Sequence, residues 1–337
     1  MGGSSSKSLA KSSCCRIAHC QCGCESASQR SNKLQHRHQS WNAKAAYTLL
    51  GRVVTMAALI AALMLSTAAG YSSPRAPVVA GNWKMNPSTS AEAVALAEAL
   101  EAVDGREVVV FPPTCYLDAV ATKANKNVAL GAQDVCVLAE SGAYTGAVSL
   151  PMLKSMPRVD YVLCGHSERR SLFSDDDDAI RAKVRGALDA GFAAMLCIGE
   201  TQQEYELGVT DDVCALQLAK ALEGVTAAEM ANIVVAYEPV WAIGTGLVCP
   251  ADVAQRVHSS IRQRLRATYD SSVADSCRIL YGGSVNPSVI DGLMRQSDID
   301  GVLVGGASLD AATFGQIASF HTGWWRTRSF LKKVFRR

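Results

Sequence analysis

Short apolar runs rich in valine, isoleucine and leucine alternate with amphipathic stretches from Pro77 to about residue 320. This alternation is typical of parallel strands that are each followed by a helix. Eight strands are predicted, at 77–83, 107–112, 127–133, 159–165, 192–199, 233–239, 278–283 and 301–306, with helices between them that include Thr89–Val103, Asp176–Ala190, Ala251–Tyr269 and Pro287–Arg295. Eight such units in about 244 residues fit one closed barrel, whereas a doubly wound sheet more often stops at five to seven strands. The sequence therefore predicts an α/β fold of the (β/α)8 barrel class, with its active site at the C-terminal ends of the strands.

The chain before this barrel has a different pattern. Residues 1–52 are rich in serine, glutamine, histidine and arginine and show no apolar period, which favours a targeting or disordered segment. Residues 53–69 form a continuous apolar run that ends in small residues. Such a run is marginal for a membrane span and more typical of a signal-type segment, and a buried helix of the barrel is the alternative. We divide the chain into a leader at 1–76, a barrel domain at 77–320 and a tail at 321–337.

Charge is distributed unevenly along the chain. Residues 1–76 hold nine Lys and Arg against one acid, and residues 321–337 hold six against none. The barrel region is left with 18 basic and 30 acidic residues, which makes it a poor generic binder of nucleic acid. Hydrophobic residues make up 49% of the chain and charged residues 19%, which excludes a disordered or collagen-like protein.

Of the twelve cysteines, five lie in the leader and seven are scattered singly through the barrel region. An odd number placed within apolar runs favours buried free thiols in a reducing compartment over disulfides or a zinc cluster. We therefore expect no metal site.

Polar residues that packing does not require follow the first, fourth and sixth predicted strands. They are Asn82 and Lys84, His166 and Glu168, and Glu238. In a closed barrel these strand ends meet at one face, so the five side chains are expected to converge. Glu238 is the most informative, because an acid that closes an apolar strand is partly desolvated and accepts a proton more readily than one in water. The alternatives are a solvated lysine, a structural histidine and, for Glu238, a buried ion pair.

Glycine-rich loops follow the last three predicted strands. Gly282-Gly283-Ser284 and Gly305-Gly306 can bring backbone amides close to an anion, and in barrels the loops after strands seven and eight commonly bind phosphate. The loop at 239–246 has a rigid start, an apolar middle and a small-residue end, which is typical of a lid that excludes water. Tight turns alone are the alternative.

Five segments, in order along the chain, resemble those of the triosephosphate isomerase family. They are AGNWKMN at 80–86, CGHSERR at 164–170, AYEPVWAIGTG at 236–246, YGGSV at 281–285 and GVLVGGASL at 301–309. The resemblance covers about 78–320 and implies the fold called the TIM barrel. It also implies a homodimer without cofactor or metal that interconverts dihydroxyacetone phosphate and glyceraldehyde 3-phosphate, in glycolysis, gluconeogenesis or carbon fixation.

The resemblance implies a role for each strand-end residue. Glu238 is the base that moves a proton between adjacent carbons, and His166 is the electrophile that polarises the substrate oxygen. Lys84 supplies positive charge, Asn82 orients the substrate, and Glu168 is expected to orient the site through Lys84 rather than to carry protons. The family is a standard example of a neutral catalytic imidazole at a helix N-terminus, and the residues after His166 are predicted to open such a helical turn.

Phosphate binding and a lid follow from the same resemblance. Backbone amides are expected to hold the phosphate without side-chain charge, and lid closure is expected to protect the enediolate. The expected phosphate-binding residues are Gly244, Ser284, Gly305 and Gly306, and the lid residues are Pro239, Trp241, Thr245 and Tyr281. Trp241 is expected to move against the segment near Glu200, while Tyr281 and Ser284 hold the closed form. Core packing is the alternative for Trp241.

Residues 133–149 correspond to the family's interface loop, in which Thr145 is expected to reach into a second subunit. The partner's loop would in turn support Asn82 and Lys84. An exposed glycine-rich turn is the alternative. Leu247 stands where the family usually has lysine and Ala147 where it usually has glutamate, so the hinge and interface are expected to differ in detail.

The two ends of the chain bear on location. The tail at 321–337 sets aromatic residues among six basic ones, which fits weak membrane contact by a short amphipathic helix as well as a disordered tail. Gly2 and Ser6 match the N-myristoylation pattern. The serine-rich, basic leader is more typical of a transit sequence, so we expect an organelle, a plastid before a mitochondrion, with the cytoplasm as the alternative.

Two other functions share some of these features. A Schiff-base aldolase or related barrel lyase would keep the phosphate loops and use Lys84 as a nucleophile, but it has no need of the lid sequence that begins at Glu238. A membrane-tethered scaffold would need neither the base nor His166 and Asn82. We therefore favour the isomerase.

Overall fold

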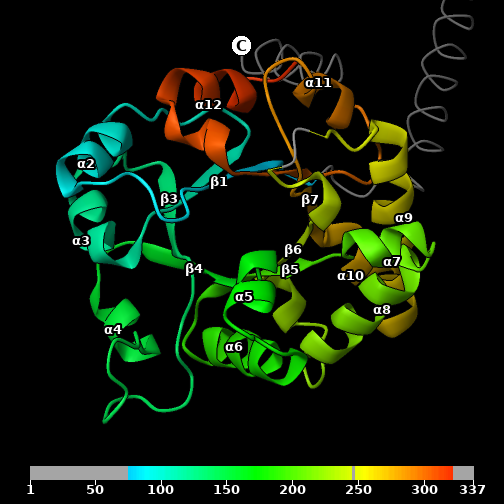
Figure 1. The fold of residues 1–337 in the computed structure, drawn as a ribbon, viewed down its shortest axis with the longest axis horizontal. Coiled ribbons are helices and arrows are strands. Elements are labelled where there is room, and N and C mark those ends of the chain that lie inside the picture. The colour runs from blue at the N-terminus through cyan, green and yellow to red at the C-terminus, as the bar shows by residue number, and fades with distance from the viewer. Residues whose placement is uncertain (1–74, 245–246, 322–337) are drawn as a thin grey trace, which may run out of the picture. The chain divides into compact units, whose positions relative to one another are not determined.

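The computed structural model describes residues 75–244 and 247–321. Eight parallel strands close into a barrel in which each strand pairs with the next along the chain and β8 returns to β1 (Figure 1). The strands are β1 (Val78–Asn82), β2 (Glu107–Phe111), β3 (Val128–Ala132), β4 (Val159–Cys164), β5 (Ala193–Ile198), β6 (Ile233–Tyr237), β7 (Arg278–Tyr281) and β8 (Gly301–Val304). The predicted (β/α)8 barrel is confirmed, and each predicted strand contains an observed one.

Alternating strand residues form two cores. Val78 and Ala80 belong to a cluster made of strand residues alone, whereas Val79 between them packs in a larger cluster that includes helix residues such as Leu117 and Val184. Successive strand residues point to opposite faces of a sheet, so the first cluster fills the barrel and the second joins strands to helices. Both faces of the sheet are covered, which explains why the strands read as continuous apolar runs.

Helices surround the barrel and connect its strands (Figure 1). They are α2 (Ser90–Glu98), α3 (Thr114–Lys123), α4 (Leu150–Ser155), α5 (Ser167–Leu172), α6 (Asp177–Asp189), α7 (Gln202–Glu206), α8 (Thr210–Ala221), α9 (Ala251–Thr268), α10 (Ser271–Ser276), α11 (Ile290–Leu293) and α12 (Ala311–Ala318), with 3-10 turns η1 (Glu229–Asn232), η2 (Val240–Ala242) and η3 (Gly306–Leu309). None of the helices in the described ranges has the length and apolar character needed to cross a membrane.

The predicted helix ends are less accurate than the strands. The predictions for α6 and α9 are correct to within one residue at each end, but α2 stops at Glu98, where the chain turns to bury Leu100. The helix predicted at 287–295 is limited to α11. Asn286 accounts for its late start, because its side chain accepts the Ser288 N–H in a local turn that competes with the helix.

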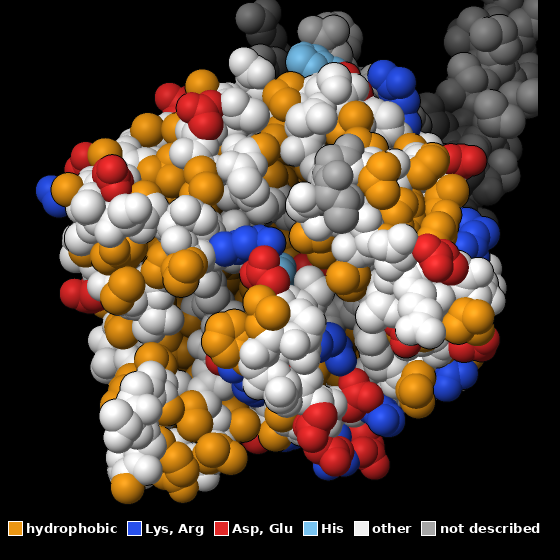
Figure 2. Space-filling model, in the orientation of Figure 1, with side chains coloured by type: hydrophobic (Ala, Val, Ile, Leu, Met, Phe, Trp, Pro, Cys, Tyr) orange, Lys and Arg blue, Asp and Glu red, His pale blue; other side chains and the backbone are white. Residues whose placement is uncertain are grey.

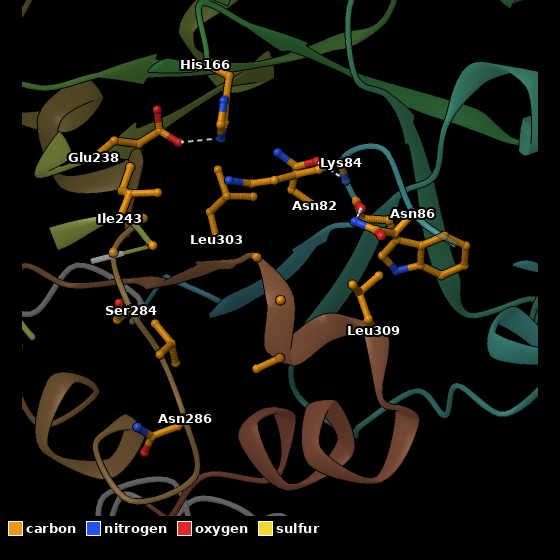
Figure 3. Close-up of a pocket in the computed structure, with 18 residues that line it drawn as sticks. Asn82, Lys84, Asn86, His166, Glu238, Ile243, Ser284, Asn286, Leu303 and Leu309 are labelled. Carbon is orange, nitrogen blue, oxygen red and sulfur yellow. Dashed lines mark hydrogen bonds and ion pairs between the residues drawn. The ribbon is translucent and has the colours of Figure 1, made fainter. Parts of the chain in front are cut away.

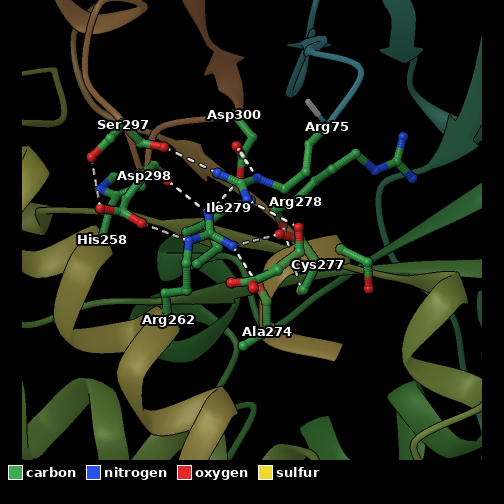
Figure 4. Close-up of polar contacts among 12 residues, drawn as sticks. Arg75, His258, Arg262, Ala274, Cys277, Arg278, Ile279, Ser297, Asp298 and Asp300 are labelled. Carbon is green, nitrogen blue, oxygen red and sulfur yellow. Dashed lines mark hydrogen bonds and ion pairs between the residues drawn. The ribbon is translucent and has the colours of Figure 1, made fainter. Parts of the chain in front are cut away.

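A buried ion network closes the end of the barrel at which β7 and β8 begin (Figure 4). Arg262 of α9 contacts Asp298 (Nε to Oδ1, 2.7 Å) and Asp300 (Nη2 to Oδ2, 2.6 Å). The side chain of Arg75 pairs with the same Asp300 carboxylate, which also accepts the backbone N–H of Ile279 at 2.9 Å. Arg75, two residues before the predicted start of the domain, is therefore tied to the barrel.

The seven cysteines in the described part of the chain are free thiols, but the predicted burial holds for only five of them. Cys115 is exposed, Cys136 is half-buried and the other five are buried. The five leader cysteines, the apolar run at 53–69 and the tail after residue 321 lie outside the described residues.

Candidate active site

A cavity of about 280 Å³ opens at the C-terminal ends of the strands (Figure 3). Figure 2 shows basic, acidic and histidine side chains gathered near the middle of this face. The four predicted catalytic residues and the four predicted phosphate-binding residues all line the cavity: Asn82, Lys84, His166, Glu238, Gly244, Ser284, Gly305 and Gly306. The structure thus brings together residues that are up to 224 positions apart in the sequence.

Glu238 follows β6 directly and is only 2% exposed. The backbone N–H of Ser167 donates to its Oε2 at 2.9 Å, and Nε2 of His166 lies 3.1 Å from its Oε1 (Figure 3). The buried thiol of Cys197 also interacts with this carboxylate. A buried carboxylate with both oxygens bonded is stabilised in a fixed orientation. The Ser167 contact was not predicted, and it arises because α5 begins beside the end of β6.

His166 is the N-cap of α5, and this position fixes its tautomer. The backbone N–H of Glu168 donates to Nδ1 at 3.2 Å, so Nδ1 carries no proton. The ring proton then sits on Nε2, where it can be donated to Glu238. This arrangement describes a neutral imidazole whose one N–H lies on the cavity wall. The helical turn expected after His166 is present as α5.

Lys84 has a left-handed backbone with φ of 52°, which a residue other than glycine adopts only when its surroundings compensate. Asn82 Oδ1 accepts the Lys84 N–H at 3.0 Å, and the side chain of Gln133 donates to the Lys84 carbonyl at 2.8 Å. The ammonium group pairs with Glu168 at 2.6 Å, as expected for a carboxylate that orients the lysine. Gln133 was not predicted, although a polar residue directly after β3 was a signal that could have identified it.

The opposite wall of the cavity consists of glycine-rich loops. A Cβ added at Gly244 or Gly306 would meet no other atom within 4 Å, so the space beside these amides is open. Gly244 has φ of +68°, a conformation that favours glycine. The Ser284 hydroxyl donates to the Ala242 carbonyl at 2.9 Å and joins the loop after β7 to the predicted lid. These loops present the small residues and backbone groups that anion binding requires.

Pro239, Trp241 and Tyr281, the predicted lid residues that the structure describes, do not line the cavity. Trp241 donates from Nε1 to Glu200 Oε1 at 2.8 Å, and the Tyr237 hydroxyl donates to the same oxygen at 3.1 Å. Burial raises the pKa of Glu200 above its usual value, although these hydrogen bonds oppose the shift. Tyr281 is fully buried under the loop at Gly283. Pro239 precedes η2, and Thr245 lies outside the described residues.

Thr145 lies in an exposed part of the segment at 133–149, which projects from the barrel below α4 in Figure 1. It does not line the cavity. Among the described residues, no group of three His, Cys, Asp or Glu side chains is placed to hold a metal ion.

One small cavity at the end of this parallel (β/α)8 barrel thus holds a buried base, a neutral imidazole, a lysine and glycine amides. This combination defines a class of enzymes that move protons on small phosphorylated substrates. The model of the triosephosphate isomerase family matches residues 77–321. This chain belongs to that family.

Individual relatives agree with the family match. The triosephosphate isomerase of Syntrophotalea carbinolica is 49% identical over 251 residues, which cover 73% of this chain and 98% of the relative. That of Roseiflexus sp. strain RS-1 is 48% identical over 252 residues, with the same coverage. That of Thermoanaerobacter sp. strain X514 is 46% identical over 254 residues and is covered completely.

Proposed function

We propose that this chain interconverts dihydroxyacetone phosphate and D-glyceraldehyde 3-phosphate through an enediolate. The observation that carries the proposal is the contact of Glu238 with His166 Nε2 at 3.1 Å, on the wall of a cavity that Lys84 and glycine amides also line. A carboxylate and a neutral ring N–H at one small cavity suit proton transfer beside a carbonyl group. The family membership and the curated relatives support the same substrate.

Each residue has a defined part in this reaction. Glu238 accepts the proton from the carbon beside the carbonyl and returns it to the neighbouring carbon, so no net proton is gained or lost. His166 donates its Nε2 proton to the substrate oxygen as negative charge develops there, and the Lys84 ammonium stabilises that charge. The ring then takes the proton of the neighbouring substrate hydroxyl, so the imidazole is neutral again when the reaction is complete. Asn82 orients the substrate, and the amides at Gly244, Ser284, Gly305 and Gly306 hold the phosphate.

The base must also move. In this structure both Glu238 oxygens are occupied, one by the Ser167 N–H at 2.9 Å and one by His166 at 3.1 Å. The carboxylate therefore has to release Ser167 before it can reach a substrate carbon. Closure of the segment that starts at Pro239 follows the same main chain, so base and lid are expected to move together.

Substitution of the base tests the proposal. Shortening Glu238 by one methylene in Glu238→Asp misplaces the carboxylate, and we expect turnover to fall about a hundredfold. Glu238→Gln removes the base and should lower turnover by on the order of 10³. Isomerisation of glyceraldehyde 3-phosphate by the full chain in a coupled assay measures both. Glu98→Asp, at an exposed acid on α2, is the matched control and should leave turnover unchanged.

The outcomes separate two errors. A folded wild-type chain without turnover would overturn the isomerase and favour a binding or scaffold role. Full turnover by Glu238→Gln, beside an active wild type, would show that another residue is the base.

We also propose that the chain forms a homodimer through the segment at 133–149, with Thr145 at the interface. The support is a set of exposed apolar side chains on and near this segment, namely Met85, Leu138, Tyr144 and Met152. Figure 2 shows hydrophobic side chains on this projecting region. Exposed apolar side chains gathered in one region mark an interaction site more often than a free surface.

We further propose that the leader at 1–76 directs the enzyme to a plastid, on the basis of its basic and nearly acid-free composition. A fluorescent reporter fused to these residues should enter plastids, and a reporter left in the cytoplasm would contradict this.

We also propose weak membrane contact by the tail at 321–337. Removal of the tail should then lower binding of the chain to anionic vesicles. Equal binding with and without the tail would contradict that contact.

A further inference from the structure

Gly199 lies directly against the main chain of the base. It follows β5, which pairs with β6 up to Ile198 and Tyr237. Beyond the strands, Glu238 N–H donates to the Ile198 carbonyl at 2.8 Å, and Val240 N–H donates to the Glu200 carbonyl at 3.2 Å. Gly199 sits between these bonds, and a Cβ added to it would lie 1.8 Å from the Glu238 carbonyl oxygen. The backbone position of Gly199 therefore determines where Glu238 can lie.

The peptide groups of Gly199 have no strand partner on their other side. Ile198 and Glu200 use their carbonyls toward β6, and backbone groups alternate in direction along a strand, so those of Gly199 point toward β4. The register between β4 and β5 ends at Cys164 and Leu196, three residues earlier. An unpaired N–H and C=O at this depth would be costly and would leave the segment loosely held.

Gln217 of α8 supplies both missing partners. The Gly199 N–H donates to Gln217 Oε1 at 2.8 Å, and Gln217 Nε2 donates to the Gly199 carbonyl at 3.2 Å. A primary amide presents a donor and an acceptor side by side, which a carboxylate or a thioether cannot do. Gln217, Gly199 and Glu238 also line one cavity of about 270 Å³, so the segment has room to shift if the amide is removed.

We infer that Gln217 is a positioning residue for the catalytic base: it holds Gly199, and Gly199 fixes the main chain of Glu238. This inference rests on the proposed isomerase function. The Glu238 carboxylate must leave Ser167 to reach the substrate, and a fixed main chain confines that movement to the side chain. Gln217 is remote from the phosphate loops, so it acts on turnover and not on phosphate binding.

Gln217→Met in the full chain tests the inference, because methionine has a similar length and neither hydrogen bond. We expect kcat to fall about tenfold, less than the roughly hundredfold loss from a misplacement of 1 Å, with KM within about twofold. The inhibition constant of inorganic phosphate should stay unchanged. Gln217→Glu keeps the acceptor but turns a carboxylate oxygen toward the Gly199 carbonyl, which is repulsive, so its kcat should fall at least as far as that of Gln217→Met.

The chain offers a matched control in Gln255 of α9. Its amide also donates and accepts, to Asp298 Oδ2 at 2.6 Å and from the Asp298 N–H at 3.0 Å, but far from the site at the other end of the barrel. Gln255→Met should lower the melting temperature about as much as Gln217→Met does and leave kcat within about twofold. A loss of kcat common to both variants would show a merely structural role and overturn the inference.

A double-mutant cycle decides whether Gln217 acts through Glu238. In the Glu238→Asp background, where the carboxylate is already misplaced, Gln217→Met should cost much less than tenfold in kcat. Equal losses in both backgrounds, or wild-type kcat in Gln217→Met, would overturn the inference and leave the isomerase intact. Absence of turnover in the wild type would overturn both.

Discussion

Two buried histidines of this barrel have different surroundings and different roles. His166 caps α5 at the cavity wall, whereas His258 lies inside α9 with its Nδ1 2.7 Å from the Ala254 carbonyl. Burial lowers the pKa of His258 from its usual value to about 4, and the hydrogen bond to Ala254 opposes the shift only in part. Its ring contacts the rings of Tyr237 and Tyr281, so His258 has a structural role in packing these two tyrosines.

Because of His258, we expect the folded state to lose stability in acid. The folded pKa of about 4 lies below the unfolded value of about 6.5, so the unfolded chain binds the extra proton first. The free energy of unfolding is therefore unaffected by His258 above pH 6.5. It decreases as the pH falls from 6.5 toward 4, by a total of about 3 kcal/mol. Measured free energies of unfolding should therefore fall across this window. In His258→Gln the slope should be smaller by about one proton, and an unchanged slope would contradict the assignment.

The residue scale also shows what local sequence reveals. Asn82, Lys84, His166 and Glu238 were predicted because polar residues at the ends of apolar strands have no packing role. The pairing of Lys84 with Glu168 was predicted, but the contacts of Lys84 with Gln133 and of Glu238 with Ser167 were not. Gln133 stands directly after a strand and could have been recognised by that position. Gln217 looks like an ordinary polar residue of a helix, and only its contact with Gly199 distinguishes it.

At the scale of elements, the weakest seam of the barrel lies between β7 and β8, whose register consists of the single pair Tyr281 and Val302. Asp300, directly before β8, adds backbone hydrogen bonds that this short register lacks. Its backbone N–H donates to the Ile279 carbonyl at 2.8 Å, and its carbonyl accepts the Val78 N–H at 3.0 Å. One residue thereby joins β1, β7 and β8, and its carboxylate is held by Arg75 and Arg262 (Figure 4).

Arg75 is therefore expected to stabilise the barrel without affecting catalysis. Its guanidinium pairs with Asp300 and also donates to the carbonyls of Asp275 and Ser297, at 3.0 Å each. Arg75→Ala should cost about 2 kcal/mol, because the buried Asp300 keeps only Arg262 as a charged partner. The melting temperature should fall by about 4–8 °C at unchanged kcat.

The control for Arg75 is an exposed pair at the same end of the barrel. Arg266 lies 2.7 Å from Asp275, with both side chains well exposed. Arg266→Ala should cost less than about 1 kcal/mol. Equal melting temperatures for the Arg75 and Arg266 variants would contradict the role of Arg75.

At the scale of the whole molecule, the segment at 133–149 is the feature that the barrel itself does not explain. Its base is bound to the site, since Gln133 contacts Lys84, while Leu138 is 76% exposed and Tyr144 is 43% exposed. A second copy of the chain that covered these side chains would also stabilise the Lys84 backbone. Assembly and catalysis are thus expected to be linked.

The double variant Leu138→Asp with Tyr144→Asp tests this link. Both side chains are exposed, so the barrel should still fold, but the charges should prevent association. We expect a dimeric mass for the wild type and a monomeric mass for the variant by light scattering, with turnover reduced about a hundredfold. Leu216→Asp, at an exposed leucine on α8, is the control and should remain dimeric and active. A fully active monomer would separate catalysis from assembly.

The sequence by itself determined the barrel and the polar residues at the C-terminal ends of its strands. Eight buried parallel strands require eight apolar runs, and this requirement is readable without coordinates. Helix ends were less readable, since α2 and α11 are limited by the turn that buries Leu100 and by the Asn286 side chain.

Only the tertiary structure decided how the site is held. The left-handed backbone of Lys84 depends on Gln133, the orientation of the Glu238 carboxylate depends on Ser167, and the position of the Glu238 main chain depends on Gly199 and Gln217. These contacts join residues that are distant along the chain or belong to different elements, so no local pattern encodes them. The position of a polar residue at the end of a strand indicates that it belongs to the site. Its orientation in the site depends on hydrogen bonds that side chains make to backbone groups without strand partners.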